Sequence, residues 1–93
     1  MAYLNQEERD KFLDEIKDLK FNKLKSKLRH KDPKNRLAYF RNVQETGYWM
    51  TRYVLPTYGT QVTIYETRDV NNKQHVDYAI DKIVVEPTPD NLL

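Results

Sequence analysis

The spacing of apolar residues changes once along this 93-residue chain, and that change limits the folds open to it. Up to about residue 30, apolar residues recur every three or four positions, which is the period of an amphipathic helix. From about residue 47 they alternate with polar residues, as in a strand with one buried face. A chain of this length forms one domain. We therefore expect a single α+β domain, residues 1–93, with an ordered core at about 5–86 and a flexible tail at 87–93.

The N-terminal region predicts an amphipathic helix over residues 5 to about 20. Asn5 and Glu8 have the spacing of a capping box, in which each side chain accepts from a free backbone amide of the first turn. An apolar stripe then follows at helical spacing and should face the core. The stripe consists of Phe12, Ile16 and Leu19.

A second apolar stripe lies about 130° around the same helical axis, so one straight helix cannot bury both stripes against one surface. This stripe consists of Phe21, Leu24 and Leu28. We therefore expect a break near residues 21–22, with Asn22 as the cap of a short second helix that ends near His30. Lysines crowd the exposed side of this helix and repel one another weakly, so the helix depends on the burial of its leucines.

Three or four antiparallel strands should follow in a meander, because short connections make consecutive strands neighbours. Residues 36–43 fit either a strand or a helix capped by Asp32, and the β-rich run that follows favours the strand. The other expected strands cover residues 47–56, residues 60–68 and the segment from residue 76 onward. The apolar parity changes at Asp81, which predicts a bulge or a strand end there. The two N-terminal helices should pack on one face of this sheet.

Composition excludes several kinds of chemistry. The chain has no cysteine, so it has no disulfide, no thiolate zinc site and no cysteine nucleophile. With two glycines it has no glycine-rich phosphate loop. His75 and Asp77 are two potential metal ligands, which is too few for a metal site, and Ser26 has no neighbouring base in the sequence. The scattered carboxylates, Glu66 among them, are interpreted as solvated charges that discourage pairing at strand edges.

These exclusions lead us to expect no catalysis, no cofactor and no bound metal. A small enzyme is the second alternative, and it would need a deep pocket that holds His75, Asp77 and a third polar group. The longest apolar runs have three residues, so we expect no contact with a membrane. We expect the protein to be cytoplasmic.

The formal net charge of +2 conceals three blocks of charge. Residues 1–16 carry −3, residues 17–41 carry +8 and residues 42–93 carry −3. Such a basic block either binds nucleic acid or another anionic surface, or is a solvated face that the acidic ends can neutralise. Seven of its ten basic residues are lysine, which favours the solvated face. The alternative function, binding of RNA or single-stranded DNA, would use Lys23, Lys27, Arg29, Lys31, Lys34 and Arg36.

Seven tyrosines and one tryptophan are more large rings than so small a core can hold. Alternation places Trp49 and Tyr53 on one face of the strand at 47–56, and it places Tyr48 and Arg52 on the other. An exposed face of Tyr, Trp and Arg has the composition of a protein–protein hot spot. We therefore favour a non-catalytic binding or adaptor domain whose aromatic sheet face or edge contacts a protein partner or a second copy. The predicted contact residues are Tyr48, Trp49, Arg52 and Tyr53.

Overall fold

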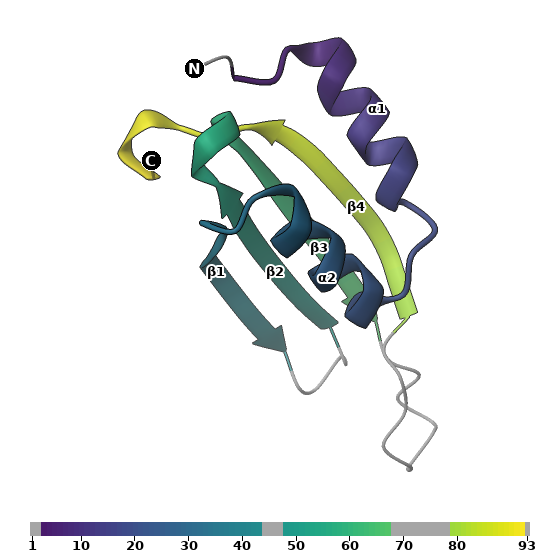
Figure 1. Ribbon diagram of the computed structural model, residues 1–93. Helices are drawn as coiled ribbons and strands as arrows, with labels where there is room; N and C mark the ends of the chain where they lie inside the picture. The colour runs from purple at the N-terminus through teal and green to yellow at the C-terminus, as the bar shows by residue number, and fades with distance from the viewer. Residues whose placement is uncertain (1–2, 44–47, 68–78, 93) are drawn as a thin grey trace.

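The structure is a computed structural model, and it describes residues 3–43, 48–67 and 79–92. Two helices come first, and an antiparallel sheet follows with the strand order β1-β2-β3-β4 (Figure 1). The elements are α1 (Gln6–Ile16), α2 (Phe21–Lys31), β1 (Arg36–Val43), β2 (Tyr48–Leu55), the 3₁₀ turn η1 (Pro56–Tyr58), β3 (Thr60–Thr67), β4 (Ala79–Pro87) and the 3₁₀ turn η2 (Asp90–Leu92). The predicted α+β fold, with N-terminal helices and an antiparallel meander, is confirmed.

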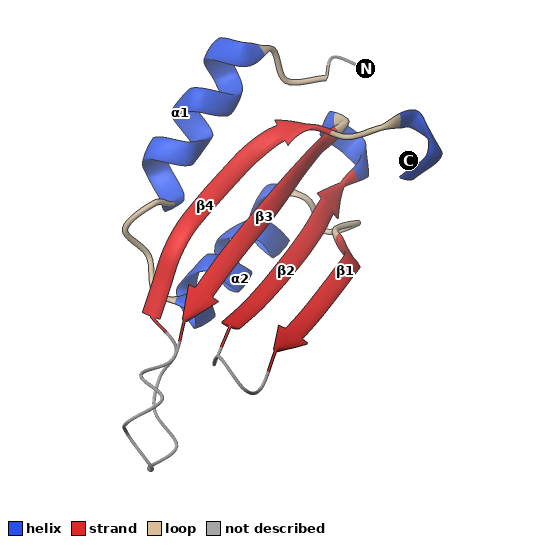
Figure 2. Ribbon diagram, turned by 180° about the vertical axis from the view of Figure 1, so that it is seen from behind, coloured by secondary structure: helices blue, strands red, loops and turns tan. Residues whose placement is uncertain are grey.

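Both helices lie on the same face of the sheet (Figure 1). α1 lies beside β4, and α2 crosses in front of β2 and β3. Seen from behind, the strands lie in front and no helix of the described chain covers them, so we call this side the open face (Figure 2). The core fills the space between the helices and the sheet. Its buried cluster consists of Phe12, Ile16, Leu24, Leu28, Leu55, Val62 and Ile64.

α1 begins as predicted and ends earlier than predicted. The Glu8 amide donates to Asn5 Oδ1 at 2.8 Å, and the Asn5 amide donates to Glu8 Oε1 at 3.2 Å, which together form the capping box. The helix ends at Ile16 instead of about residue 20, because the chain turns at residues 17–18. That turn changes the direction of the chain, so the second apolar stripe can reach the same core as the first.

α2 begins at Phe21, so the predicted break is confirmed while the predicted cap is wrong. Lys20 occupies the cap position in an extended conformation and makes no side-chain cap hydrogen bond, and Asn22 lies inside the first turn. Leu24 and Leu28 are completely buried against the sheet. A short helix without a capping side chain is stable here because its apolar side is packed.

The structure resolves the two uncertain points of the sheet. Residues 36–43 form β1, which pairs with β2, so the strand interpretation is confirmed. On β4, Lys82 pairs with Tyr65 and Ile80 pairs with Glu66, so Asp81 is an extra residue in the ladder. This bulge stands where the apolar parity changes in the sequence.

The turn between β2 and β3 holds both ends of the described chain. The Leu4 amide donates to the Tyr58 carbonyl at 3.2 Å, and the Thr88 amide donates to the Gly59 carbonyl at 2.9 Å. Gly59 has a φ of 56°, and a Cβ at this position would lie 2.6 Å from the Tyr3 ring. Glycine is therefore required at this corner, both for its conformation and for the close approach of the N-terminal segment.

The segment after β4 contacts the sheet through Thr88 and Leu92. Thr88 is buried, and the Arg36 guanidinium donates to the Leu92 carbonyl, which joins η2 to the start of β1. The flexibility expected for residues 87–93 stays a prediction.

Candidate binding surface

β1 exposes large apolar side chains on both faces of the sheet. Leu37 is 54% exposed, Tyr39 is 42% exposed and Phe40 is 49% exposed. A bulge at Ala38 interrupts the alternation of β1. Leu37 and Phe40 therefore both lie on the side of the helices, and Tyr39 lies on the open face. Among the described residues, Tyr3 is the one other large apolar residue with comparable exposure. Three of these four exposed side chains therefore lie on one edge strand.

The position of β1 explains why these side chains stay exposed. β1 pairs with β2 on one side and is the last strand of the sheet on the other side. α2 covers β2 and β3, and the buried core cluster contains no residue of β1 (Figure 1). We call the free side of this strand, together with Leu37, Tyr39 and Phe40, the β1 edge. Its backbone amides and carbonyls offer the hydrogen bonds of a further strand.

The four predicted contact residues lie on β2, next to this edge, and are divided between the two faces. Trp49 and Tyr53 lie on the helix side, where Tyr53 packs against the core and the Trp49 ring centroid lies 5.1 Å from that of Phe40. Tyr48 and Arg52 lie on the open face. All four are partly buried. The structure thus does not bring them together on one surface.

The open face alternates cations and aromatic rings. The Arg52 guanidinium carbon lies 5.8 Å from the Tyr39 ring centroid, and Arg52 Nε donates to Thr63 Oγ1 at 3.0 Å. Further across the sheet, Lys82 Nζ lies 5.7 Å from the Tyr65 ring centroid. These contacts orient the ring of Tyr39 and the guanidinium of Arg52 beside the β1 edge.

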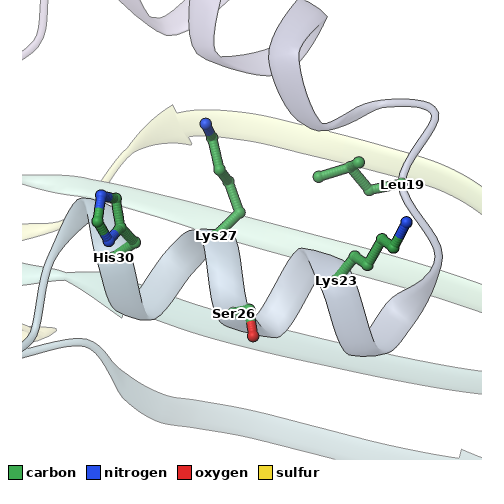
Figure 3. Close-up of a pocket in the computed structure, with 5 residues that line it drawn as sticks. All are labelled: Leu19, Lys23, Ser26, Lys27 and His30. Carbon is green, nitrogen blue, oxygen red and sulfur yellow. The ribbon is translucent and has the colours of Figure 1, made fainter.

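The residues predicted for nucleic-acid binding do not form one patch. Lys23 and Lys27 line an open groove of about 480 Å³ along α2, and their side chains extend from the helix on the side nearer α1 (Figure 3). The other residues that line it are Leu19, Ser26 and His30. Arg29 lies about 200° around the helix from Lys27, so it belongs to a different side of α2.

The remaining predicted basic residues have contacts within the fold. Lys31 is partly buried, and its Nζ lies 5.3 Å from the Phe12 ring centroid and 4.9 Å from the Tyr58 ring centroid. Arg36 donates to the Leu92 carbonyl, as described above. Lys34 is exposed in the turn between α2 and β1. Lys31 therefore contributes to packing and is poorly placed to contact a ligand.

Among the residues that the structure describes, the acidic ends of the chain form few ion pairs with the basic block. Within residues 3–43, 48–67 and 79–92, the one ion pair joins Lys17 Nζ to Asp14 Oδ1 at 3.3 Å. The other basic residues of the block have no carboxylate partner in this part of the chain. Positive charge is therefore left for a partner, both on the exposed side of α2 and on β1.

Two carboxylates of the described residues are buried, and the sequence interpretation of one of them is wrong. Glu66 is 7% exposed on the helix side of β3, opposite Trp49, so it is no solvated charge. Burial raises the pKa of Glu66 above its ordinary value of 4.5. The pKa of Tyr53 is raised above 10.0, first by burial and second by the charge of Glu66. Alternation along β3 places Glu66 on the same face as the buried Val62 and Ile64. The burial of that face is a property of the tertiary structure.

The second buried carboxylate, Asp32, joins α2 to η1. Asp32 is 1% exposed and its two oxygens accept from the Lys34 amide, the Thr57 amide and the Thr57 hydroxyl, each at 3.0 Å. A buried carboxylate is stable when donors surround it in this way. We assign Asp32 a structural role.

The side chains considered as metal ligands are not brought together in the described residues. His75 and Asp77 lie outside them, and in the remainder no three acidic or histidine side chains are grouped to hold a metal ion. No helix in this part of the chain is long and apolar enough to cross a membrane. No family model, curated protein or solved structure matches the chain. A function must therefore be argued from the surface itself.

The exposed apolar residues of β1 were missed at the sequence level, although a signal was present. Leu37, Tyr39 and Phe40 occupy both parities of one strand. Helices packed on one face of a sheet cover at most one parity of an edge strand, so an edge strand that is apolar at both parities exposes some of its apolar surface.

Proposed function

We propose that this protein is a non-catalytic binding domain that takes up an extended segment of another protein as a fifth strand beside β1. The observation that carries the proposal is the exposure of Leu37, Tyr39 and Phe40 on the free edge of the sheet. Trp49 and Arg52 would support this contact from β2, since they touch Phe40 and Tyr39 respectively. The predicted protein-binding role thus moves from a face of β2 to the adjacent edge.

Edge strands of monomeric proteins are usually short or carry proline, charged side chains or β-bulges that hinder further pairing. β1 carries a bulge at Ala38 and two arginines, but it has eight residues, no proline and an apolar middle. Each half-exposed side chain that becomes buried contributes about 1 kcal/mol, and the backbone hydrogen bonds of a fifth strand add register and specificity. These features support strand addition.

A display library of random peptides, selected against the full chain, tests this proposal. We expect peptides whose binding protects the amides of β1 from hydrogen exchange. Phe40→Lys should weaken the binding of the selected peptides by tenfold or more (about 1.4 kcal/mol), because it places a charge at the apolar contact. The matched control is Tyr3→Ser, which alters the exposed ring away from β1 and should leave binding unchanged.

A library that yields no binder would contradict the proposal, as would binders insensitive to Phe40→Lys.

Binding of single-stranded nucleic acid is the second candidate, favoured by the cations and rings that alternate on the open face. The lysines of the α2 groove lie on the helix side of the sheet and are not part of this open-face arrangement. Titration with an oligouridylate at several salt concentrations separates the two functions. Steeply salt-dependent binding that shifts the tyrosines of the open face would favour nucleic acid.

A further inference from the structure

We infer that the strand taken up by β1 is acidic, with two carboxylates four residues apart and apolar side chains between them. This inference rests on the proposed strand addition and specifies the chemistry of the partner. It follows from the arrangement of charge and apolar surface along β1.

The two arginines of β1 lie on one face at a defined spacing. Arg36 pairs with Val54 and Arg41 pairs with Met50, which are four residues apart on β2. The arginines are five residues apart on β1, and a bulge at Ala38 takes up the extra residue, so both lie on the open face. Both arginines are exposed. The Arg36 guanidinium donates one hydrogen bond to the Leu92 carbonyl and has further N–H donors for a carboxylate. Four strand residues span about 13 Å, so a strand on the free side of β1 places its residues i and i+4 beside the two guanidinium groups. Carboxylates at these two positions would complete two ion pairs.

Two apolar side chains between the arginines, Leu37 and Phe40, lie on the opposite side of the sheet, which is the helix side. Leu37 pairs with Tyr53 and Phe40 pairs with Thr51, and these β2 residues are two apart. On an added strand, residues i+1 and i+3 would therefore face Leu37 and Phe40 on the helix side. Residue i+2 would lie beside Tyr39 on the open face. The complementary pattern is acidic, apolar, any residue, apolar, acidic.

Charge favours an acidic partner over a second copy of this chain. β1 has the sequence RLAYFRNV, with two arginines and no acidic residue. Pairing of two β1 strands would bring four arginines to one interface with no carboxylate from either strand. In the described part of the molecule, no carboxylate pairs with Arg36 or Arg41. An acidic strand supplies the missing charge, whereas a second copy doubles the repulsion.

Short end-blocked peptides test the inference directly. The probe is Ser-Glu-Val-Thr-Val-Glu-Ser, and its neutral control is Ser-Gln-Val-Thr-Val-Gln-Ser. Binding is followed through the backbone amide NMR shifts of β1. We expect the acidic peptide to bind about tenfold more tightly at low salt, since two exposed ion pairs together have roughly that effect. High salt should reduce the difference between the two peptides.

A variant that removes the charge of one arginine tests whether β1 causes the preference for the acidic peptide. Arg41→Gln should remove much of the preference for the acidic peptide and leave the binding of the neutral peptide unchanged. Lys27→Gln makes the same change of charge in the α2 groove and should leave the preference intact. A third peptide, Ser-Glu-Glu-Thr-Val-Val-Ser, has the same composition with the wrong spacing and should lose the preference.

The outcomes separate this inference from the proposed function. Equal binding of the acidic and neutral peptides at β1 would overturn the inference and leave strand addition standing. If neither peptide moves the β1 amides and the display library also fails, both are wrong. Dimerisation of the chain that Phe40→Lys abolishes would replace the acidic partner with a second copy. Oligouridylate bound at β1 in place of peptide would overturn both.

Discussion

β1 and β3 are strands of eight residues in the same sheet, and they lie in opposite environments. β1 is the more apolar of the two, with five apolar residues against three, yet three of its large apolar residues are exposed. On β3, Val62 and Ile64 are completely buried, and even Thr63 and Glu66 are covered. β3 has a strand on each side and α2 above it, whereas β1 has one neighbour and no helix. Position in the sheet, more than composition, decides burial here.

The largest expected loss of stability comes from a substitution on β3, the buried strand. Ile64→Ala should lower the free energy of unfolding by about 3 kcal/mol, because it removes buried methyl groups and leaves a cavity under α2. Leu37→Ala on β1 should cost less than about 0.5 kcal/mol, since little buried surface is lost. Urea unfolding of both variants measures the difference. Similar losses for the two variants would show that β1 is packed as tightly as β3.

The second prediction concerns Asp32, which links α2 to the turn between β2 and β3. Asp32→Ala removes the acceptor of three hydrogen bonds and leaves the Thr57 amide without its partner. We expect a loss of about 2 kcal/mol in the free energy of unfolding. The control Asp18→Ala, at an exposed position, should change it by less than about 0.5 kcal/mol. An unchanged midpoint for Asp32→Ala would show that water replaces these bonds.

The third prediction is that the stability of the fold depends on pH, because Glu66 on β3 is buried. The pKa of Glu66 in the folded protein lies above its ordinary value of 4.5, so the folded state binds this proton more tightly than the unfolded chain does. Its contribution to stability is therefore full below pH 4.5 and is lost as the pH rises through the raised pKa. Glu66→Gln should accordingly match the wild type in acid and exceed it in stability at neutral pH.

Unfolding in urea from about pH 4 to about pH 8 measures this difference, which we expect to be smaller than the effect of Asp32→Ala. Glu86→Gln, on the open face of β4, is the matched control. A stability difference for Glu66→Gln that does not change with pH would argue against the burial of this charge in solution.

The smallest expected change in stability lies on the β1 edge. Phe40→Ser should alter the free energy of unfolding by less than about 0.5 kcal/mol, since half of the side chain is already in water. The same variant should lose the binding of the peptides that the display library selects. A large loss of stability would mean that Phe40 belongs to the core, and the comparison between β1 and β3 would then fail.

Local patterns predicted the elements of this fold well. The capping box at Asn5 and Glu8, the break before α2 and the bulge at Asp81 follow from short-range chemistry, and the structure confirms each of them. The cap of α2 could not be predicted, because burial of Leu24 and Leu28 stabilises that helix without a capping side chain. Sequence spacing also separated the two faces of β2 correctly, but it could not tell which face the helices cover.

The sequence by itself determined the two hydrophobic periods, the antiparallel order and the concentration of positive charge at residues 17–41. All three are properties of neighbouring residues. Only the tertiary structure decided that α2 covers β2 and β3 and leaves β1 bare, because the placement of a helix depends on contacts between distant segments. That placement buries Glu66 and exposes Leu37, Tyr39 and Phe40. It also leaves Arg36 and Arg41 without an acidic partner in the described chain, which is why the partner we propose is an acidic strand.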